Sequence, residues 1–187
     1  MLVVVLAWFA LDRIEEKIQA DVGEALQIVL QTTQESLNMW VESNKFQIGR
    51  LAEDPLLISL VERQLSVPRN KDALLQSDAL RELRAFFQSR KNKFGQAGFF
   101  IIAPDFINIG SMCENNLGLR YLIACQALDR LNQAFRGQTV IVPPVWSDVL
   151  LNSSSNAKSQ TTPTMFFAAP VKDVQDKIIA VIHGGQV

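Results

Sequence analysis

The chain has 187 residues, enough for one sizeable hydrophobic core with an appended helix. Hydrophobic residues make up 48% and charged residues 20% of the sequence, a composition typical of a folded globular protein. The formal net charge is −1 at pH 7, so no positive field attracts a polyphosphate backbone. This charge argues against nucleic acid as a partner.

Residues 1–11 are all apolar, and Asp12 and Arg13 end the run. A bilayer requires roughly 20 apolar residues, so this segment is about half of a membrane span. It lacks the basic leader and the cleavage site of a secretory signal. We favour a partial transmembrane or signal-anchor segment, the start of which precedes Met1, over a signal remnant or a buried core helix. The sequence upstream of Met1 decides between these interpretations.

Residues 12–52 contain no proline, and apolar residues recur there at steps of three and four, the period of one helical face. The stripe comprises Ile14, Ile18, Val22, Leu26, Val29, Thr33, Leu37, Trp40, Ile48 and Leu51. A helix of this length extends about 60 Å at 1.5 Å per residue. So long an amphipathic helix needs a partner, which is either the sheet of its own domain or a second copy of the helix in a homodimer.

The remaining residues, 53–187, alternate between helical and strand patterns. Asp54-Pro55 is a helix start, Gly137 a helix stop, Pro143-Pro144 a strand end and 173–177 a turn. The pattern predicts helices at 56–65, 74–90 and 122–135 and strands at 99–103, 107–112, 139–142, 165–171 and 178–184. The expected fold class is α+β: a long N-terminal helix and a mostly antiparallel five-stranded sheet with helices on one face.

Four stretches resemble, in order, the membrane-distal module of double Cache sensor domains, which are PAS-like. They are Phe99-Phe100-Ile101-Ile102-Ala103-Pro104-Asp105, then Ser111-Met112 with Asn116-Leu117-Gly118, then 134–140 running to 143–149, then 163–171 with 178–181. The resemblance covers about residues 12–183. It implies a long helix emerging from a membrane and a ligand-sensing domain at 53–187. Such receptors continue into a second module and an output domain, so we expect this chain to be a fragment.

The resemblance also implies a small-molecule ligand, an amino acid or another carboxylate or amine, between the sheet and its covering loops. Trp146 and Asp148 resemble an aromatic-x-Asp pair and Asp173 a further acid, which together suit an ammonium group. Arg120-Tyr121 lies where similar domains hold the ligand carboxylate, although Leu122 replaces the expected tryptophan. Ser111 and Thr164, near strand ends, are candidate pocket hydroxyls.

Each of these residues also has a structural interpretation. Asp173 suits a tight turn, Trp146 a core position, Asp148 a cap and Arg120 a surface charge. The single histidine, His183, is expected to be structural or exposed. Cys113 and Cys125 are either two buried small hydrophobes or a disulfide in an oxidising compartment.

No catalytic motif is present in the sequence. It contains no Gly-x-Ser-x-Gly, phosphate loop or His-Glu-x-x-His, and one histidine cannot supply the usual metal sets. We therefore expect no enzyme activity, metal or cofactor.

The predicted function is the extracytoplasmic sensor domain of a bacterial inner-membrane receptor, facing the periplasm. The receptor would be of the histidine kinase, chemoreceptor or nucleotide cyclase type, and ligand binding would be relayed through the N-terminal helix. The first alternative is a membrane-tethered interaction or dimerisation module without a ligand. The second is a soluble PAS-like domain that buries its apolar start.

Overall fold

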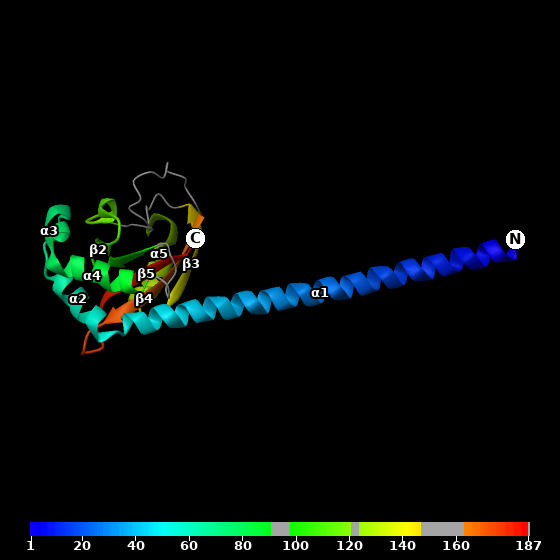
Figure 1. Ribbon diagram of the computed structural model, residues 1–187, viewed down its shortest axis with the longest axis horizontal. Coiled ribbons are helices and arrows are strands. Elements are labelled where there is room, and N and C mark those ends of the chain that lie inside the picture. Colours follow the sequence, from blue (N-terminus) through cyan, green and yellow to red (C-terminus); the bar gives the residue numbers. More distant parts are fainter. Residues whose placement is uncertain (91–97, 121–123, 147–162, 187) are drawn as a thin grey trace. The chain divides into compact units, whose positions relative to one another are not determined.

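The computed structural model describes residues 1–90, 98–120, 124–146 and 163–186 (Figure 1). The chain forms two compact units, Met1–Glu42 and Ser43–Val187. The first unit is helical from Leu2 onward, and the second holds the sheet and the shorter helices. The last residues of the long helix therefore belong to the same compact unit as the sheet.

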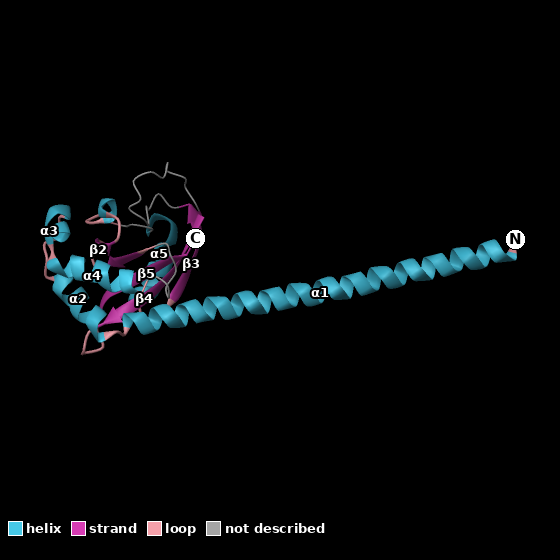
Figure 2. Cartoon of the chain, viewed as in Figure 1, coloured by secondary structure: helices cyan, strands magenta, loops and turns pink. Residues whose placement is uncertain are grey.

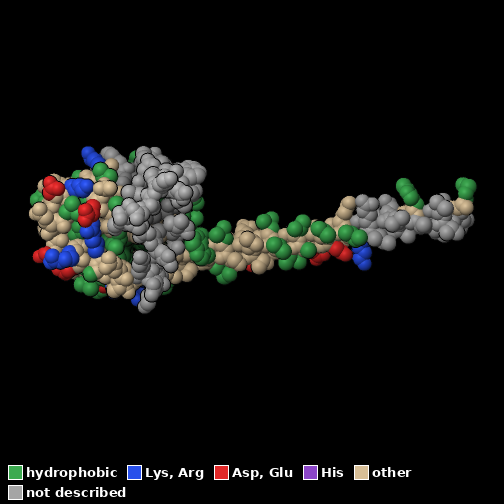
Figure 3. Space-filling model, turned by 45° about the horizontal axis from the view of Figure 1, so that its top comes forward, with side chains coloured by type: hydrophobic (Ala, Val, Ile, Leu, Met, Phe, Trp, Pro, Cys, Tyr) green, Lys and Arg blue, Asp and Glu red, His purple; other side chains and the backbone are tan. Residues whose placement is uncertain are grey.

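Helix α1 (Leu2–Ala52) joins the apolar segment 1–11 and the predicted helix 12–52 without a break. In the first unit, Ile18, Val22 and Leu26 are all more than half exposed. Figure 3 shows hydrophobic side chains recurring along the described part of this helix. Among the described residues, no helix is both long and apolar enough to cross a membrane.

The sheet of the second unit has five antiparallel strands in the order β2-β1-β5-β4-β3 (Figure 2). The strands are β1 (Phe99–Ile102), β2 (Asn108–Ser111), β3 (Val140–Trp146), β4 (Pro163–Lys172) and β5 (Ile178–Gln186). Hairpins join β1 to β2 and β4 to β5, and helix α5 (Ala124–Phe135) lies between β2 and β3 in the chain. The predicted α+β class with a five-stranded antiparallel sheet is confirmed.

Helices cover both faces of the sheet, so the expectation of a single covered face is wrong. Residues Ala127, Leu131 and Ala134 of α5 pack on one face. On the opposite face, the ring of Phe87 stacks on Phe99 with a centroid distance of 3.7 Å. The reason is visible in β1, whose four residues are all buried although successive side chains point to opposite faces.

The end of α1 also packs on this second face. Ile48 and Leu51 are buried, in contrast to the exposed stripe of the first unit. A Cβ atom added to Gly184 of β5 would lie 3.1 Å from Cδ1 of Ile48. Glycine at this position therefore permits the close approach of helix and strand.

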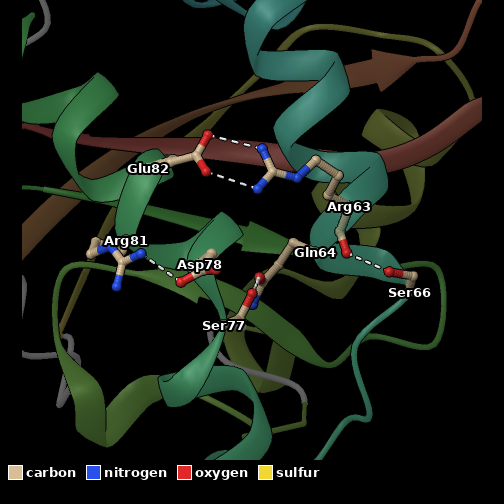
Figure 4. Close-up of polar contacts among 7 residues, drawn as sticks. All are labelled: Arg63, Gln64, Ser66, Ser77, Asp78, Arg81 and Glu82. Carbon is tan, nitrogen blue, oxygen red and sulfur yellow. Dashed lines mark hydrogen bonds and ion pairs between the residues drawn. The ribbon is translucent and has the colours of Figure 1, made fainter.

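Helix α2 (Pro55–Leu65) begins as predicted, because the backbone N–H of Leu56 donates to Oδ1 of Asp54 over 2.9 Å. The single helix predicted over 74–90 is wrong. The segment forms α3 (Lys71–Gln76) and α4 (Asp78–Ser89), which are separated at Ser77 by an extended backbone with ψ 130°. Figure 4 shows a contact made at this break: the Ser77 hydroxyl donates to Oε1 of Gln64 in α2, over 2.7 Å.

Strand β3 continues through Pro143 and Pro144 to Trp146, so the predicted strand end at these prolines is wrong. The pairing with β4 shifts register between Val142 and Val145. Because β3 is an edge strand, the missing proline N–H groups break no ladder on its outer side. The predicted helix stop at Gly137 is confirmed by its φ of +95°.

Candidate functional site

Five residues form one row across the sheet, one from each strand. In the order of the strands they are Ser111, Phe100, His183, Ala168 and Val140. Directly paired residues share a face, and Phe100, Ala168 and Val140 contact α5. All five are buried. Two polar side chains, Ser111 and His183, therefore lie in an otherwise apolar layer on the α5 side of the sheet.

His183 is the central polar group of this row, buried and not exposed. Its ring stacks on Phe100 at 4.6 Å and an interplanar angle of 13°. Burial lowers the pKa of the imidazole from 6.5 to about 3, and a hydrogen bond with the Val181 backbone raises it by a smaller amount. His183 is therefore neutral at pH 7. Nδ1 is buried and has no hydrogen-bond partner among the described residues.

An unpaired buried nitrogen costs about 1–3 kcal/mol, which makes it a rare feature in folded proteins. A bound polar molecule would remove this cost by pairing with the nitrogen. The imidazole of His183 is therefore a candidate contact for a ligand on the α5 side of the sheet.

Ser111 connects this row to two neighbouring segments. Its Oγ accepts a hydrogen bond from the backbone N–H of Cys113 over 3.1 Å, and its carbonyl oxygen accepts one from Nε of Arg84 in α4 over 3.0 Å. Cys113 is a buried free thiol, and the side chain of Cys125 lies outside the described part of the chain. The short 3-10 helix η1 (Glu114–Asn116) follows directly. Ser111 thus joins α4 to the segment that leaves the sheet.

The candidates Trp146 and Thr164 lie together at one end of the sheet. Trp146 pairs with Pro163, and Thr164 pairs with Val145. Along β4, Thr164 is four residues from Ala168, which is about 13 Å in an extended strand. Trp146 and Thr164 therefore lie away from the central row, at the end of the sheet where β4 begins.

Asp173 lies in the β4–β5 turn, at the opposite end of the sheet. Its Oδ1 accepts hydrogen bonds from the backbone N–H groups of Gln175 and Lys177, over 2.8 and 3.0 Å. These are the bonds of the turn interpretation. Asp173 is nine positions from Thr164 along the chain, about 30 Å in an extended strand.

Arg120 belongs to the same end as Asp173. It bridges to Ile107, and its Nε donates to the carbonyl oxygen of Asp105 in the β1–β2 turn over 3.2 Å. Ile102, just before the β1–β2 turn, pairs with Val181, just after the β4–β5 turn, so both turns lie at the same end of the sheet. The Arg120 residue is exposed.

The predicted residues therefore form two groups and not one. Ser111, Trp146 and Thr164 lie at or beyond the central row, and Arg120 and Asp173 lie at the turns. An amino-acid-sized ligand cannot contact Thr164 and Asp173 together, because about 30 Å of strand separates them. Tyr121 and Asp148 lie outside the described residues.

The sequence analysis did not predict that His183 lies buried in the centre of the sheet. The available signal was its place in the run Ala180-Val181-Ile182-His183, where alternation puts the imidazole on the same face as the buried Val181. A lone imidazole at the end of an apolar strand is read more readily as a strand terminus. Only the strand pairing places it in the centre of the sheet.

An open groove of about 500 Å³ lies along α3 and α4. Its lining residues are Leu75, Gln76, Ser77, Leu80, Arg81, Arg84, Ala85 and Gln88. None of the predicted ligand-binding residues is among them. Within the described ranges, no three His, Cys, Asp or Glu side chains are grouped to hold a metal ion.

The fold matches solved sensor domains, at low sequence identity. The sensor domain of E. coli DcuS matches with a TM-score of 0.51 and 12% identity, over 77% of this chain and 86% of that one. The sensor domain of the V. cholerae histidine kinase DctB matches with a TM-score of 0.52 and 16% identity, over 86% of this chain. The match spans only 56% of the DctB domain.

This chain shares the fold of these two sensor domains. The fold expected from the four sequence stretches is thus confirmed. No protein-family model matches the chain. No curated protein has significant sequence similarity to it.

Proposed function

We propose that the chain is the small-molecule-sensing domain of a bacterial membrane receptor, held at the inner membrane with the sheet in the periplasm. The observation that carries this proposal is the buried, unpartnered Nδ1 of His183 on the α5 side of a Cache-like sheet. A polar atom in that position is satisfied by a ligand that enters between the sheet and α5. The fold shared with DcuS and DctB sensor domains supports the same function.

The ligand is proposed to be an amino acid, an amine or a carboxylate. Ser111 and His183 would contact it from the central row, and Trp146 and Thr164 from the neighbouring end of the sheet. Tyr121 and Asp148 are proposed to complete this group with a phenol and a carboxylate, which pair with polar ligand atoms.

Arg120 and Asp173 form a second proposed contact group at the turns. Their side chains already bond the backbone of those turns. They would reach a ligand only by exchanging these bonds.

The signal is proposed to pass from the sheet to α1. Ile48 of α1 lies against Gly184 of β5, which is next to His183. A ligand shifts such an equilibrium only by binding the two arrangements with different affinity. Residues 1–11 would anchor the helix in the membrane, and the exposed stripe with Ile18, Val22 and Leu26 would pair with a second copy.

A thermal-shift screen of the 187-residue chain against amino acids, amines and carboxylates tests the proposal. A true ligand raises the unfolding midpoint by mass action. The shift should disappear in His183→Phe, which keeps a ring on Phe100 but removes both nitrogens. Asp148→Ala should also abolish it, whereas Asp129→Ala, an exposed acid of α5, is the matched control. No shift from any compound class, or equal shifts in all four proteins, would overturn the proposal.

The second candidate function is a membrane-tethered dimerisation module without a ligand. The exposed apolar residues of the first unit favour it, since Leu26 is 64% exposed and Val29 61% exposed. If this function is the correct one, Leu26→Lys should abolish self-association measured by analytical ultracentrifugation, and no compound should move the unfolding midpoint.

A further inference from the structure

The groove along α3 and α4 carries two arginines on one helical face. Ser77, Arg81, Arg84 and Gln88 line it and recur at steps of three and four residues, so they are neighbours on the surface of α4. Its volume of about 500 Å³ is ample for a small organic molecule. The groove therefore combines space with positive charge and amide donors.

The charge of Arg84 has a long and partly exposed ion pair. Its Nη1 lies 3.8 Å from Oε1 of Glu114, whose side chain is 63% exposed. The Nε donor is used by the carbonyl oxygen of Ser111, and Nη2 is buried without a hydrogen-bond partner among the described residues. The Arg84 side chain is only 24% exposed, so water compensates its charge poorly.

Arg63 of α2 shows the contrasting case on the same layer of helices. Its Nη1 and Nη2 donate to the two carboxylate oxygens of Glu82 over 2.9 and 2.8 Å, a bidentate pair that is drawn in Figure 4. Glu82 faces Arg63 and does not line the groove. The acid on α4 thus compensates Arg63 and leaves Arg84 without a comparable partner.

We propose that the groove along α3 and α4 binds a small organic anion, a carboxylate or a phosphate, through Arg84 and Arg81. A planar guanidinium presents paired N–H donors that match the oxygen atoms of a carboxylate and of a phosphate, so the same arginines can bind either anion. Arg81 is 78% exposed and pairs with Asp78 in Figure 4, so it can turn to share a bound anion. The exposed amides of Gln76 and Gln88 add donors on the same surface.

This site is separate from the α5 side of the sheet, and Arg84 connects the two. Its Nε holds the carbonyl oxygen of Ser111, the residue that begins the central row. An anion in the groove would fix the Arg84 guanidinium and, through it, the end of β2. The anion is therefore a second input to the same sheet and not the sensed ligand itself.

The test is a titration of the full chain with sodium succinate and with sodium phosphate, each against sodium chloride at equal ionic strength. We expect a saturable rise of the unfolding midpoint with succinate, phosphate or both, and none with chloride. A response to succinate alone identifies a carboxylate site, and one to phosphate alone a phosphate site. An equal effect of all three salts overturns the proposal, because it reflects ionic strength only.

The matched variants are Arg84→Gln and Arg63→Gln, which remove one arginine each from the same helical layer. Affinity should fall at least tenfold in Arg84→Gln and stay within twofold of the parent in Arg63→Gln. Should Arg84→Gln not fold, Arg81→Gln, at an exposed position, should weaken binding several-fold. Equal binding by the parent and the groove variant overturns the proposal. His183→Phe should leave the titration unchanged, which separates this site from the proposed sensing function.

Discussion

Nε2 of Gln64 in α2 donates a hydrogen bond to the carbonyl oxygen of Ile109 in β2, over 2.8 Å. The Gln64 residue is fully buried, and its Oε1 accepts the hydroxyl proton of Ser77. One amide thus joins α2, the start of α4 and the edge strand of the sheet. The contact with Ser77 is made at the break between α3 and α4, where the backbone is extended.

Gln64→Leu should destabilise the second unit by about 2–4 kcal/mol. The substitution keeps the volume but leaves the Ile109 carbonyl and the Ser77 hydroxyl without partners, at about 1–3 kcal/mol each. Urea unfolding followed by circular dichroism measures the change. A loss below about 0.5 kcal/mol would show that water replaces the amide at both positions.

His183→Phe should raise the free energy of unfolding of the ligand-free protein by about 1 kcal/mol. The substitution removes a buried nitrogen that has no partner and keeps an aromatic ring on Phe100. Chemical denaturation without added ligand is the measurement. Destabilisation by more than about 1 kcal/mol would mean that the imidazole makes a hydrogen bond that stabilises the fold.

The stability of the parent should fall as the pH is lowered from 6.5. The folded-state pKa of His183, about 3, lies below the ordinary value of 6.5, so between these values the unfolded chain binds a proton that the folded protein does not. The expected loss from this group is about 1.4 kcal/mol per pH unit. The free energy of unfolding is measured for the parent and for His183→Phe at pH 6.5, 5.5 and 4.5. The difference between the two proteins isolates the contribution of His183, because the carboxyl groups titrate in both. Parallel curves for the two proteins would contradict the assignment.

Asp54→Ala and Asp54→Asn should differ in their effects. Asp54 caps α2 through Oδ1 and pairs through Oδ2 with Nη2 of Arg90 over 2.9 Å. Alanine removes both contacts and should cost about 1–2 kcal/mol. Asparagine keeps the cap and loses only the ion pair, so its cost should stay below about 1 kcal/mol. Equal losses in thermal or urea unfolding would assign the effect to the ion pair.

Much of the fold follows from local patterns in the sequence. The Asp54-Pro55 start, the Gly137 stop and the apolar strand runs each depend on a residue and its immediate neighbours. The break at Ser77 is different, since the side chain bonded there is that of Gln64, thirteen positions away. The passage of β3 through Pro143 and Pro144 depends on its place at the edge of the sheet, which only strand pairing reveals.

The candidate site was harder to predict for the same reason. The family resemblance selects residues by their position in the sequence, but register decides which of them meet. Thr164 and Asp173 are both on or next to β4, yet its extended backbone separates them by about 30 Å. His183 meets Phe100 and Ala168 only through pairing with two different strands.

The most direct test of the sensing function uses the fact that His183 is the only histidine in the chain. Protein labelled with ¹⁵N-histidine gives imidazole nitrogen signals from this residue alone. A compound that raises the unfolding midpoint of Arg84→Gln as much as that of the parent acts outside the groove along α3 and α4. Such a compound should shift the Nδ1 resonance, with the same dissociation constant in both experiments. If it stabilises the protein and leaves the His183 nitrogens unchanged at saturation, the ligand does not bind at the α5 side of the sheet.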